Sequence, residues 1–176
     1  MSYLNFLFLF ICVPTGILIY LFARSKESDK NFNLKGIAIL CILATLYTTP
    51  WDNYLVAKQV WWYGQDRVLG TIGYVPIEEY AFFVLQTIMT GLWSFFIIKK
   101  LHVKKSLLNS KKTFLGVKVL LIGVWLYGLF ALTQESSFYM GLILSWATPI
   151  LILQFFIGGK YVLASIRKLL VGAFIP

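Results

Sequence analysis

The sequence predicts an all-α protein, a multi-pass transmembrane helical bundle of about five to six spans. Hydrophobic residues make up 59% of its 176 residues and charged residues only 13%, and the mean hydropathy is +0.78. Soluble domains are about half apolar and about one quarter charged, and a chain of this length cannot hide so much apolar surface in its own core. We therefore expect residues 1–176 to form one membrane domain, with lipid as the main solvent.

Five apolar runs are long enough to span a bilayer, which takes about 20 mostly apolar residues. No basic segment precedes the first run, and Arg24 and Lys26 follow it, so it predicts an anchor rather than a cleaved signal peptide. The tail, residues 160–176, alternates basic and apolar residues and predicts an interfacial helix or the start of a sixth span. The expected spans are residues 3–23, 35–49, 76–98, 114–132 and 138–157.

The net charge is +9, and nearly all the Lys and Arg residues lie in three short segments, residues 24–35, 99–112 and 160–168. This placement is typical of loops on one membrane face rather than of a nucleic-acid surface, so we expect no nucleic-acid partner. Lys58 and Arg67 are the only basic residues of the second loop, and the fourth loop has no basic residue. The positive-inside rule then predicts an N-terminus outside and Lys-rich loops in the cytoplasm, against anionic lipid.

Metal and nucleotide chemistry find no support in the sequence. Cys12 and Cys41 both lie within apolar runs and are expected to be small buried hydrophobic side chains. His102 lies in a Lys-rich loop with no Cys or His neighbour, which argues against a zinc site. The glycine patterns of dinucleotide-binding and P-loop folds are absent from the sequence.

One polar, aromatic stretch lies between Pro50 and Trp93. Its part up to Tyr80 contains four of the seven acidic residues and three of the six Trp residues. Acids at a membrane boundary are costly to bury and therefore suggest function. A structural interpretation also exists, because acids favour a helix N-terminus and Trp and Tyr form interfacial belts. An interfacial belt does not need three acids, so a functional role is favoured for Asp52, Glu78 and Glu79. Asp66 and Arg67 are expected to form a structural charge pair.

Pro76 suits the first turn of the third span, which places both glutamates in that turn. Adjacent helical residues point about 100° apart, so the side chains of Glu78 and Glu79 cannot both reach the same point. The helical spacing predicts one polar and aromatic wall, made of Glu79, Phe82 or Phe83, Gln86, Thr90 and Trp93.

The same stretch resembles the integral-membrane lycopene cyclases of fungi, archaea and some bacteria, which occur as heterodimers or fused to phytoene synthase. The similarity covers most of the chain, and its long central motif is specific. The segments that carry it are residues 50–54 (Pro-Trp-Asp-Asn-Tyr), 61–63 (Trp-Trp-Tyr), 73–83 (Gly-Tyr-Val-Pro-Ile-Glu-Glu-Tyr-Ala-Phe-Phe) and 144–149 (Leu-Ser-Trp-Ala-Thr-Pro).

The resemblance implies a redox-neutral isomerisation that closes a β-ionone ring at the linear ends of lycopene, giving γ-carotene and then β-carotene. It implies no nucleotide-binding fold, and this chemistry requires no metal or redox cofactor. The resemblance also implies that Asp52, Glu78 and Glu79 correspond to the family's carboxylates. The candidates for binding the substrate and shielding its cation are Trp51, Trp61, Trp62, Tyr80, Phe82, Phe83 and Gln86.

Ring closure begins when an acid protonates a terminal alkene, and it ends when a base removes a proton. The acid must stay protonated at neutral pH, and burial in apolar surroundings raises a carboxyl pKa by as much as about 3–5 units. We expect Glu78 or Glu79 to donate the proton, with Glu79 favoured because its helical face carries the polar wall. Asp52 would orient the donor or remove the final proton.

Members of the family usually carry a second, similar module with its own Asp and paired acids, and the sequence ends at Pro176 before such a repeat. We therefore expect a fragment, or one half of an assembly whose partner is a second cyclase subunit, another copy of the chain or phytoene synthase. Two other functions remain open: an intramembrane glutamate protease, although Phe83 replaces the Arg of its Glu-Glu-x-x-x-Arg motif, and a non-catalytic membrane binding or transport subunit.

Overall fold

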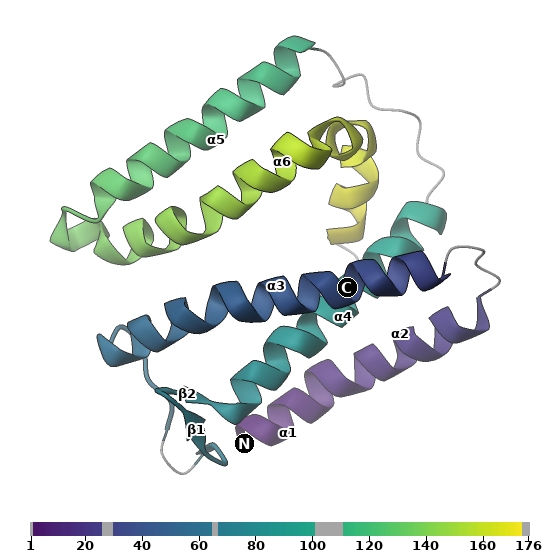
Figure 1. Cartoon of the computed structure of the whole chain (residues 1–176), viewed down its shortest axis with the longest axis horizontal. Helices are drawn as coiled ribbons and strands as arrows, with labels where there is room; N and C mark the ends of the chain where they lie inside the picture. Colours follow the sequence, from purple (N-terminus) through teal and green to yellow (C-terminus); the bar gives the residue numbers. More distant parts are fainter. Residues whose placement is uncertain (1, 26–29, 65–66, 101–110, 174–176) are drawn as a thin grey trace. The chain divides into compact units, whose positions relative to one another are not determined.

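The computed structural model describes residues 2–25, 30–64, 67–100 and 111–173. Apart from one short hairpin, their regular structure is helical (Figure 1). Within these ranges five helices are long and apolar enough to cross a membrane, which confirms the predicted multi-pass helical fold. The chain divides into two compact units, residues 1–96 and 97–176.

The first unit begins with one membrane-length rod. It consists of α1 (Tyr3–Leu7), a π-helical turn η1 (Phe8–Cys12) and α2 (Val13–Arg24). The side chain of Ser2 caps the rod by accepting a hydrogen bond of 3.3 Å from the backbone N–H of Asn5. The cap fixes the start of the rod, and Tyr3 is therefore the first helical residue.

Helix α3 (Lys30–Ala57) is longer than the sequence predicted, because the expected end at Thr49 is wrong. The helix continues through Pro50, and the side-chain amide of Asn53 donates a 2.9 Å hydrogen bond to the carbonyl of Thr49. Pro50 lacks the N–H that would bond to the carbonyl of Leu46, and membrane helices tolerate this loss. Asp52 consequently lies on a helix and not in the loop where the sequence placed it.

A two-stranded hairpin follows in the segment that the sequence predicted as the second loop. Strand β1 (Thr71–Ile72) pairs antiparallel with β2 (Val75–Pro76). The turn between them contains Gly73 at φ 66°, a left-handed conformation that glycine adopts without strain. Figure 1 shows the hairpin beside the N-terminus and the start of α4 (Ile77–Lys100), which begins one residue after Pro76.

The apolar core of the first unit joins α2, α3 and α4. Phe22, Ile37, Cys41 and Leu92 are its buried members. Cys41 thus has the predicted role of a small buried side chain, whereas Cys12 is only partly buried, and both are free thiols.

The second unit consists of α5 (Lys111–Ala131), a 3₁₀ turn η3 (Glu135–Ser137) and α6 (Phe138–Ala173). Gly128 and Gly141 allow α5 and α6 to approach closely, and the rings of Phe114 and Phe155 stack at 5.0 Å. Helix α6 continues past Lys160, so the tail extends this helix and is not a separate one.

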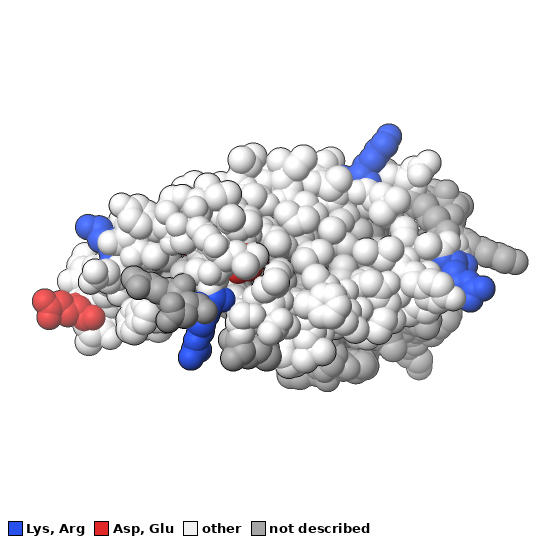
Figure 2. Space-filling model, turned by 90° about the horizontal axis from the view of Figure 1, so that it is seen from below, with Lys and Arg blue, Asp and Glu red and all other residues white. Residues whose placement is uncertain are grey.

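Large apolar side chains cover the outer surfaces of the helices. Leu46 of α3 is 67% exposed and Leu120 of α5 is 63% exposed. Among the described residues visible in Figure 2, Lys, Arg, Asp and Glu appear only as a few isolated side chains. Surfaces of this kind fit lipid contact and place the chain in a membrane.

Candidate active site

The first unit brings Glu79 together with two tyrosines that the sequence did not single out. Glu79 is the third residue of α4, and the phenol of Tyr3 donates a hydrogen bond to its Oε2 atom. Tyr63, in the loop after α3, also forms a side-chain hydrogen bond with Glu79. The two phenol rings stack, with centroids 6.2 Å apart and an interplanar angle of 18°. Three distant segments of the chain therefore meet at one carboxyl group.

Asp52 lies in the same cluster. Its side chain is only 4% exposed, and its Oδ2 atom has no hydrogen-bond partner among the described residues. It lies close enough to interact electrostatically with Glu79, Tyr3 and Tyr63. Asp52 and Glu79 therefore form a pair of interacting acids, of which Asp52 is buried and Glu79 is partly buried.

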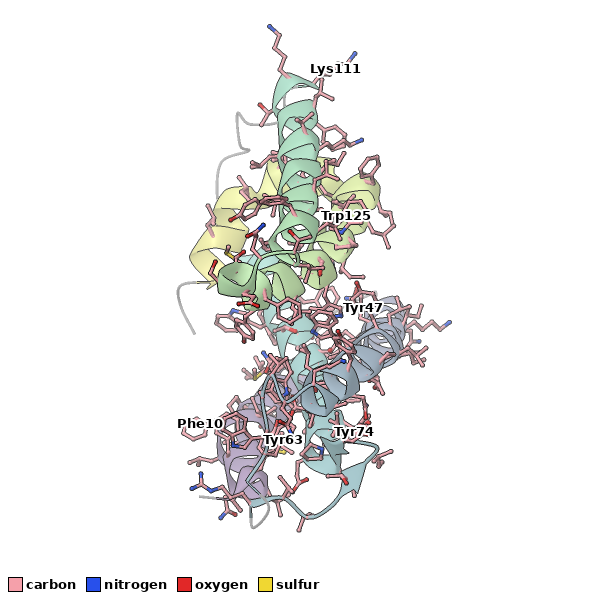
Figure 3. All side chains as sticks on the ribbon, turned by 90° about the vertical axis from the view of Figure 1, so that its left-hand side faces the viewer. Phe10, Tyr47, Tyr63, Tyr74, Lys111 and Trp125 are labelled. Atoms are coloured by element: carbon pink, nitrogen blue, oxygen red, sulfur yellow. The ribbon has the colours of Figure 1, made fainter. Side chains whose placement is uncertain are left out.

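The environment of Tyr63 favours its neutral phenol. Burial, followed by the negative charge of Glu79, raises the pKa of Tyr63 above its ordinary value, and a hydrogen bond from Trp61 opposes this shift. The phenol therefore keeps its proton at neutral pH and can donate it in a hydrogen bond to Glu79. Figure 3 shows Tyr63 beside the purple ribbon of α1 and α2, whereas Tyr74 lies at the hairpin.

Glu78 belongs to a different environment from Glu79, as the helical geometry predicted. Its side chain is 3% exposed, and its Oε1 atom accepts a 2.7 Å hydrogen bond from the backbone N–H of Leu69. Its Oε2 atom is buried without a partner in the described part of the chain. Glu78 thus ties α4 to the loop before the hairpin, while Glu79 faces the tyrosines and Asp52.

Asn53 fixes the hairpin to the end of α3. Its Oδ1 atom accepts a 2.8 Å hydrogen bond from the backbone N–H of Tyr74, and its Nδ2 atom lies 3.3 Å from the phenol oxygen of Tyr80. The Tyr80 phenol donates a 3.0 Å hydrogen bond to the carbonyl of Ile72. A side chain on Gly73 would collide with the Asn53 amide. Asn53 of α3 and Tyr80 of α4 therefore hold the hairpin in place.

The candidate substrate-binding residues do not all lie together. The rings of Tyr80 and Phe83 meet edge to face at 5.9 Å, and Trp51 stacks with Tyr54 at 6.3 Å. Trp62 is 79% exposed and does not contribute to the buried cluster. The partly buried candidates are Trp51, Trp61, Tyr80, Phe82 and Gln86, and Phe83 is buried.

Sequence reasoning missed Tyr3, Tyr63 and the bridging role of Asn53. Tyrosine near a span end is typical of an interfacial belt, and Tyr3 and Glu79 are 76 positions apart. Asp66 of the expected charge pair, and His102 with most of its Lys-rich loop, lie outside the described residues. Within the described ranges no three His, Cys, Asp or Glu side chains are grouped as metal ligands.

Comparison with known proteins identifies the family. The chain is 37% identical to the lycopene beta-cyclase of Halobacterium salinarum over 99% of its own length and 73% of that protein. It is 31% identical to the bifunctional lycopene cyclase/phytoene synthase of Blakeslea trispora over its whole length, but it covers only 30% of that protein. The corresponding Arthroderma gypseum protein is 33% identical over 79% of the chain, which covers 26% of that protein. No protein-family model and no solved structure matches the chain. The similarity to the Halobacterium salinarum enzyme shows that this chain belongs to the lycopene cyclase family.

Proposed function

We propose that the chain is a lycopene β-cyclase of carotenoid biosynthesis, an isomerase that closes β-ionone rings at the linear ends of lycopene. The observation that carries this proposal is the 37% identity to a lycopene beta-cyclase over 99% of the chain. The products are γ-carotene after one ring closure and β-carotene after two. Neither an intramembrane protease nor a transport subunit is favoured by any of these relatives.

The reaction needs two proton transfers and no electron transfer. An acid protonates the terminal trisubstituted alkene, which leaves a tertiary cation. A neighbouring double bond attacks this cation, so that a new carbon–carbon bond closes the six-membered ring and the positive charge moves into the ring. Loss of a ring proton to a base restores a double bond, and the product is an isomer of the substrate.

The acids of the first unit suit these transfers. Asp52 and Glu79 are close to each other, and apolar surroundings disfavour charging both acids at once. One of them can therefore remain a carboxylic acid while the other is a carboxylate, which is the combination that a proton donor and a proton acceptor require. Glu78 supports the loop of this site through Leu69.

Aromatic side chains near these acids can shield the cation from water. A cation over a desolvated aromatic face gains about 2 kcal/mol or more. Tyr80 and Phe83 form an edge-to-face pair on α4, and Trp51 lies on α3 next to Asp52. We assign substrate contact to these rings, to Trp61 and Phe82, and to the amide of Gln86. Trp62 is exposed and suits a contact with the part of the polyene that lies in lipid.

The fungal relatives are named as fusions of a lycopene cyclase and a phytoene synthase. The proposed partners are therefore a phytoene synthase, a second cyclase subunit or another copy of this chain, together with the lipid bilayer. The proposed orientation puts the N-terminus outside and the Lys-rich loops in the cytoplasm, because the basic residues alternate between successive loops.

Expression in lycopene-accumulating cells, followed by pigment analysis, tests the function. The chain should convert lycopene into γ-carotene and β-carotene, and Glu79→Gln, expressed at the same level, should leave lycopene unchanged. The proposal is contradicted if cells that contain the folded wild-type chain accumulate only unchanged lycopene, also when a second cyclase module is co-expressed.

A further inference from the structure

The paired acids differ sharply in their hydrogen-bond partners. Glu79 is bonded to two phenols, from α1 and from the loop after α3. Asp52 has a buried oxygen atom without any partner in the described part of the chain. This asymmetry bears on which acid carries the proton, a question on which the sequence alone favoured Glu79.

We propose that Tyr3 and Tyr63 are positioning residues that hold Glu79 as the carboxylate that removes the final proton, and that Asp52 is the acid that starts ring closure. This assignment rests on the proposed function. It reverses the roles that the sequence suggested for the two acids, and it gives the N-terminal segment of the chain a part in the reaction.

The partners of Glu79 favour its charged form. A phenol hydroxyl that points at a carboxyl oxygen donates its proton, and hydrogen bonds donated to a carboxylate stabilise the ion relative to the acid. Tyr3 donates to Oε2 of Glu79, and Tyr63 remains neutral next to it. The stacked rings restrict both phenols, so they hold the carboxylate in one orientation.

The surroundings of Asp52 favour its neutral form. A buried carboxylate oxygen without a hydrogen-bond donor, such as Oδ2 of Asp52, is costly to charge, and a second negative charge near Glu79 adds to that cost. Besides each other, Asp52 of α3 and Glu79 of α4 interact with two described titratable groups, Tyr3 of α1 and Tyr63 of the loop. Together they favour a negative charge on Glu79 and a proton on Asp52.

The proton balance of a turnover follows from this arrangement. Asp52 gives its proton to the terminal alkene carbon and becomes a carboxylate while the ring closes. Glu79 then takes the ring proton and becomes an acid. The two acids interact electrostatically, and return of this proton from Glu79 to Asp52 restores the starting state, so a turnover needs no net proton uptake.

The pH dependence of turnover tests the role of the phenols. Tyr3→Phe and Tyr63→Phe should each lower kcat about tenfold or more, because the Glu79 carboxylate loses a contact that orients it, while KM for lycopene changes little. Without a phenol the Glu79 carboxylate is less stable and takes up a proton at higher pH. The acidic limb of the rate profile should therefore move to higher pH.

A matched control is Tyr127→Phe, which removes a phenol hydroxyl from a 49% exposed side chain on α5. This variant should keep the wild-type profile. If Tyr3→Phe and Tyr63→Phe lower activity but leave the acidic limb in place, the two tyrosines are structural and the assignment is wrong.

Infrared difference spectroscopy of the membrane-embedded protein tests the position of the proton without any need for turnover. Asp52→Asn should remove a C=O stretching band of a protonated carboxyl group at neutral pH, and the Tyr3→Phe/Tyr63→Phe double variant should shift that band. If the band survives in Asp52→Asn and disappears in Glu79→Gln, the assignment is overturned. If the wild type instead closes no ring but shows the Asp52 band, the proposed function fails and the proton assignment stands.

Discussion

Two neighbouring residues, Glu78 and Glu79, show how much one helical step matters at this site. Their separation of about 100° around the helix was predictable from the sequence. Their partners were not, because Tyr3 reaches Glu79 across 76 positions and Leu69 reaches Glu78 through the backbone of a loop. The sequence therefore identified the acids, while only the structure distinguishes their surroundings.

The two glutamates should respond differently to loss of charge. Glu78→Gln keeps a carbonyl oxygen that can accept the hydrogen bond of Leu69, so activity should fall only a few-fold. Glu79→Gln removes the negative charge next to Asp52 and should lower β-carotene formation by about 100-fold or more. The measurement is the ratio of cyclised to linear carotenoid at equal amounts of protein in the membrane. Equal losses in both variants would contradict the separate roles.

Gly73 should be intolerant of any side chain. Its φ of 66° is costly for other residues, and an added Cβ would overlap the Asn53 amide. Gly73→Ala should therefore cost about 1–3 kcal/mol of stability and lower the melting temperature of the detergent-solubilised protein. Gly16→Ala is the control, because a Cβ there meets no other atom within 4 Å and alanine favours a helix. A melting temperature for Gly73→Ala that equals that of the control would refute the strain argument.

At the scale of elements, the sequence predicted the helices well and the second loop poorly. Apolar length alone located five spans, because a bilayer demands about 20 apolar residues of each. The rule that proline ends a helix failed at Pro50, because membrane helices tolerate an internal proline and α3 continues to Ala57. The hairpin has only two residues in each strand, too few for a sequence signal, and it depends on a hydrogen bond from Tyr74 to Asn53 of α3.

The packing of α5 against α6 should depend on glycine at one position of α6. A Cβ at Gly141 would lie 2.7 Å from the backbone nitrogen of Leu132 and 2.8 Å from the carbonyl carbon of Ala131. Backbone atoms cannot move aside as a side chain can, so Gly141→Ala should cost about 1–3 kcal/mol. Thermal unfolding in detergent measures this cost. Gly123→Ala, with no atom within 4 Å of its Cβ, should be neutral, and equal melting temperatures for the two variants would contradict close packing.

At the scale of the whole molecule, membrane topology and the site support each other. Tyr3 begins the first span, Asp52 lies near the end of the second, and Glu79 lies in the first turn of the third. These three can meet only if successive spans run in alternating directions, as the Tyr3–Glu79 hydrogen bond requires. The site therefore lies toward the membrane face that carries the N-terminus and the second loop.

The alternation of basic residues predicts that this face is the outer one. Lys58 follows the second span and Lys112 lies at the start of the fourth, and both are exposed. In a chain with Cys12→Ala and Cys41→Ala, a cysteine introduced by Lys58→Cys should react with a membrane-impermeant maleimide in intact cells. A cysteine introduced by Lys112→Cys should react only after permeabilisation, because an odd number of spans separates the two positions. Labelling in the opposite order would place the acids toward the cytoplasm and would contradict the proposed orientation, while the alternation of spans that brings Tyr3 to Glu79 would remain.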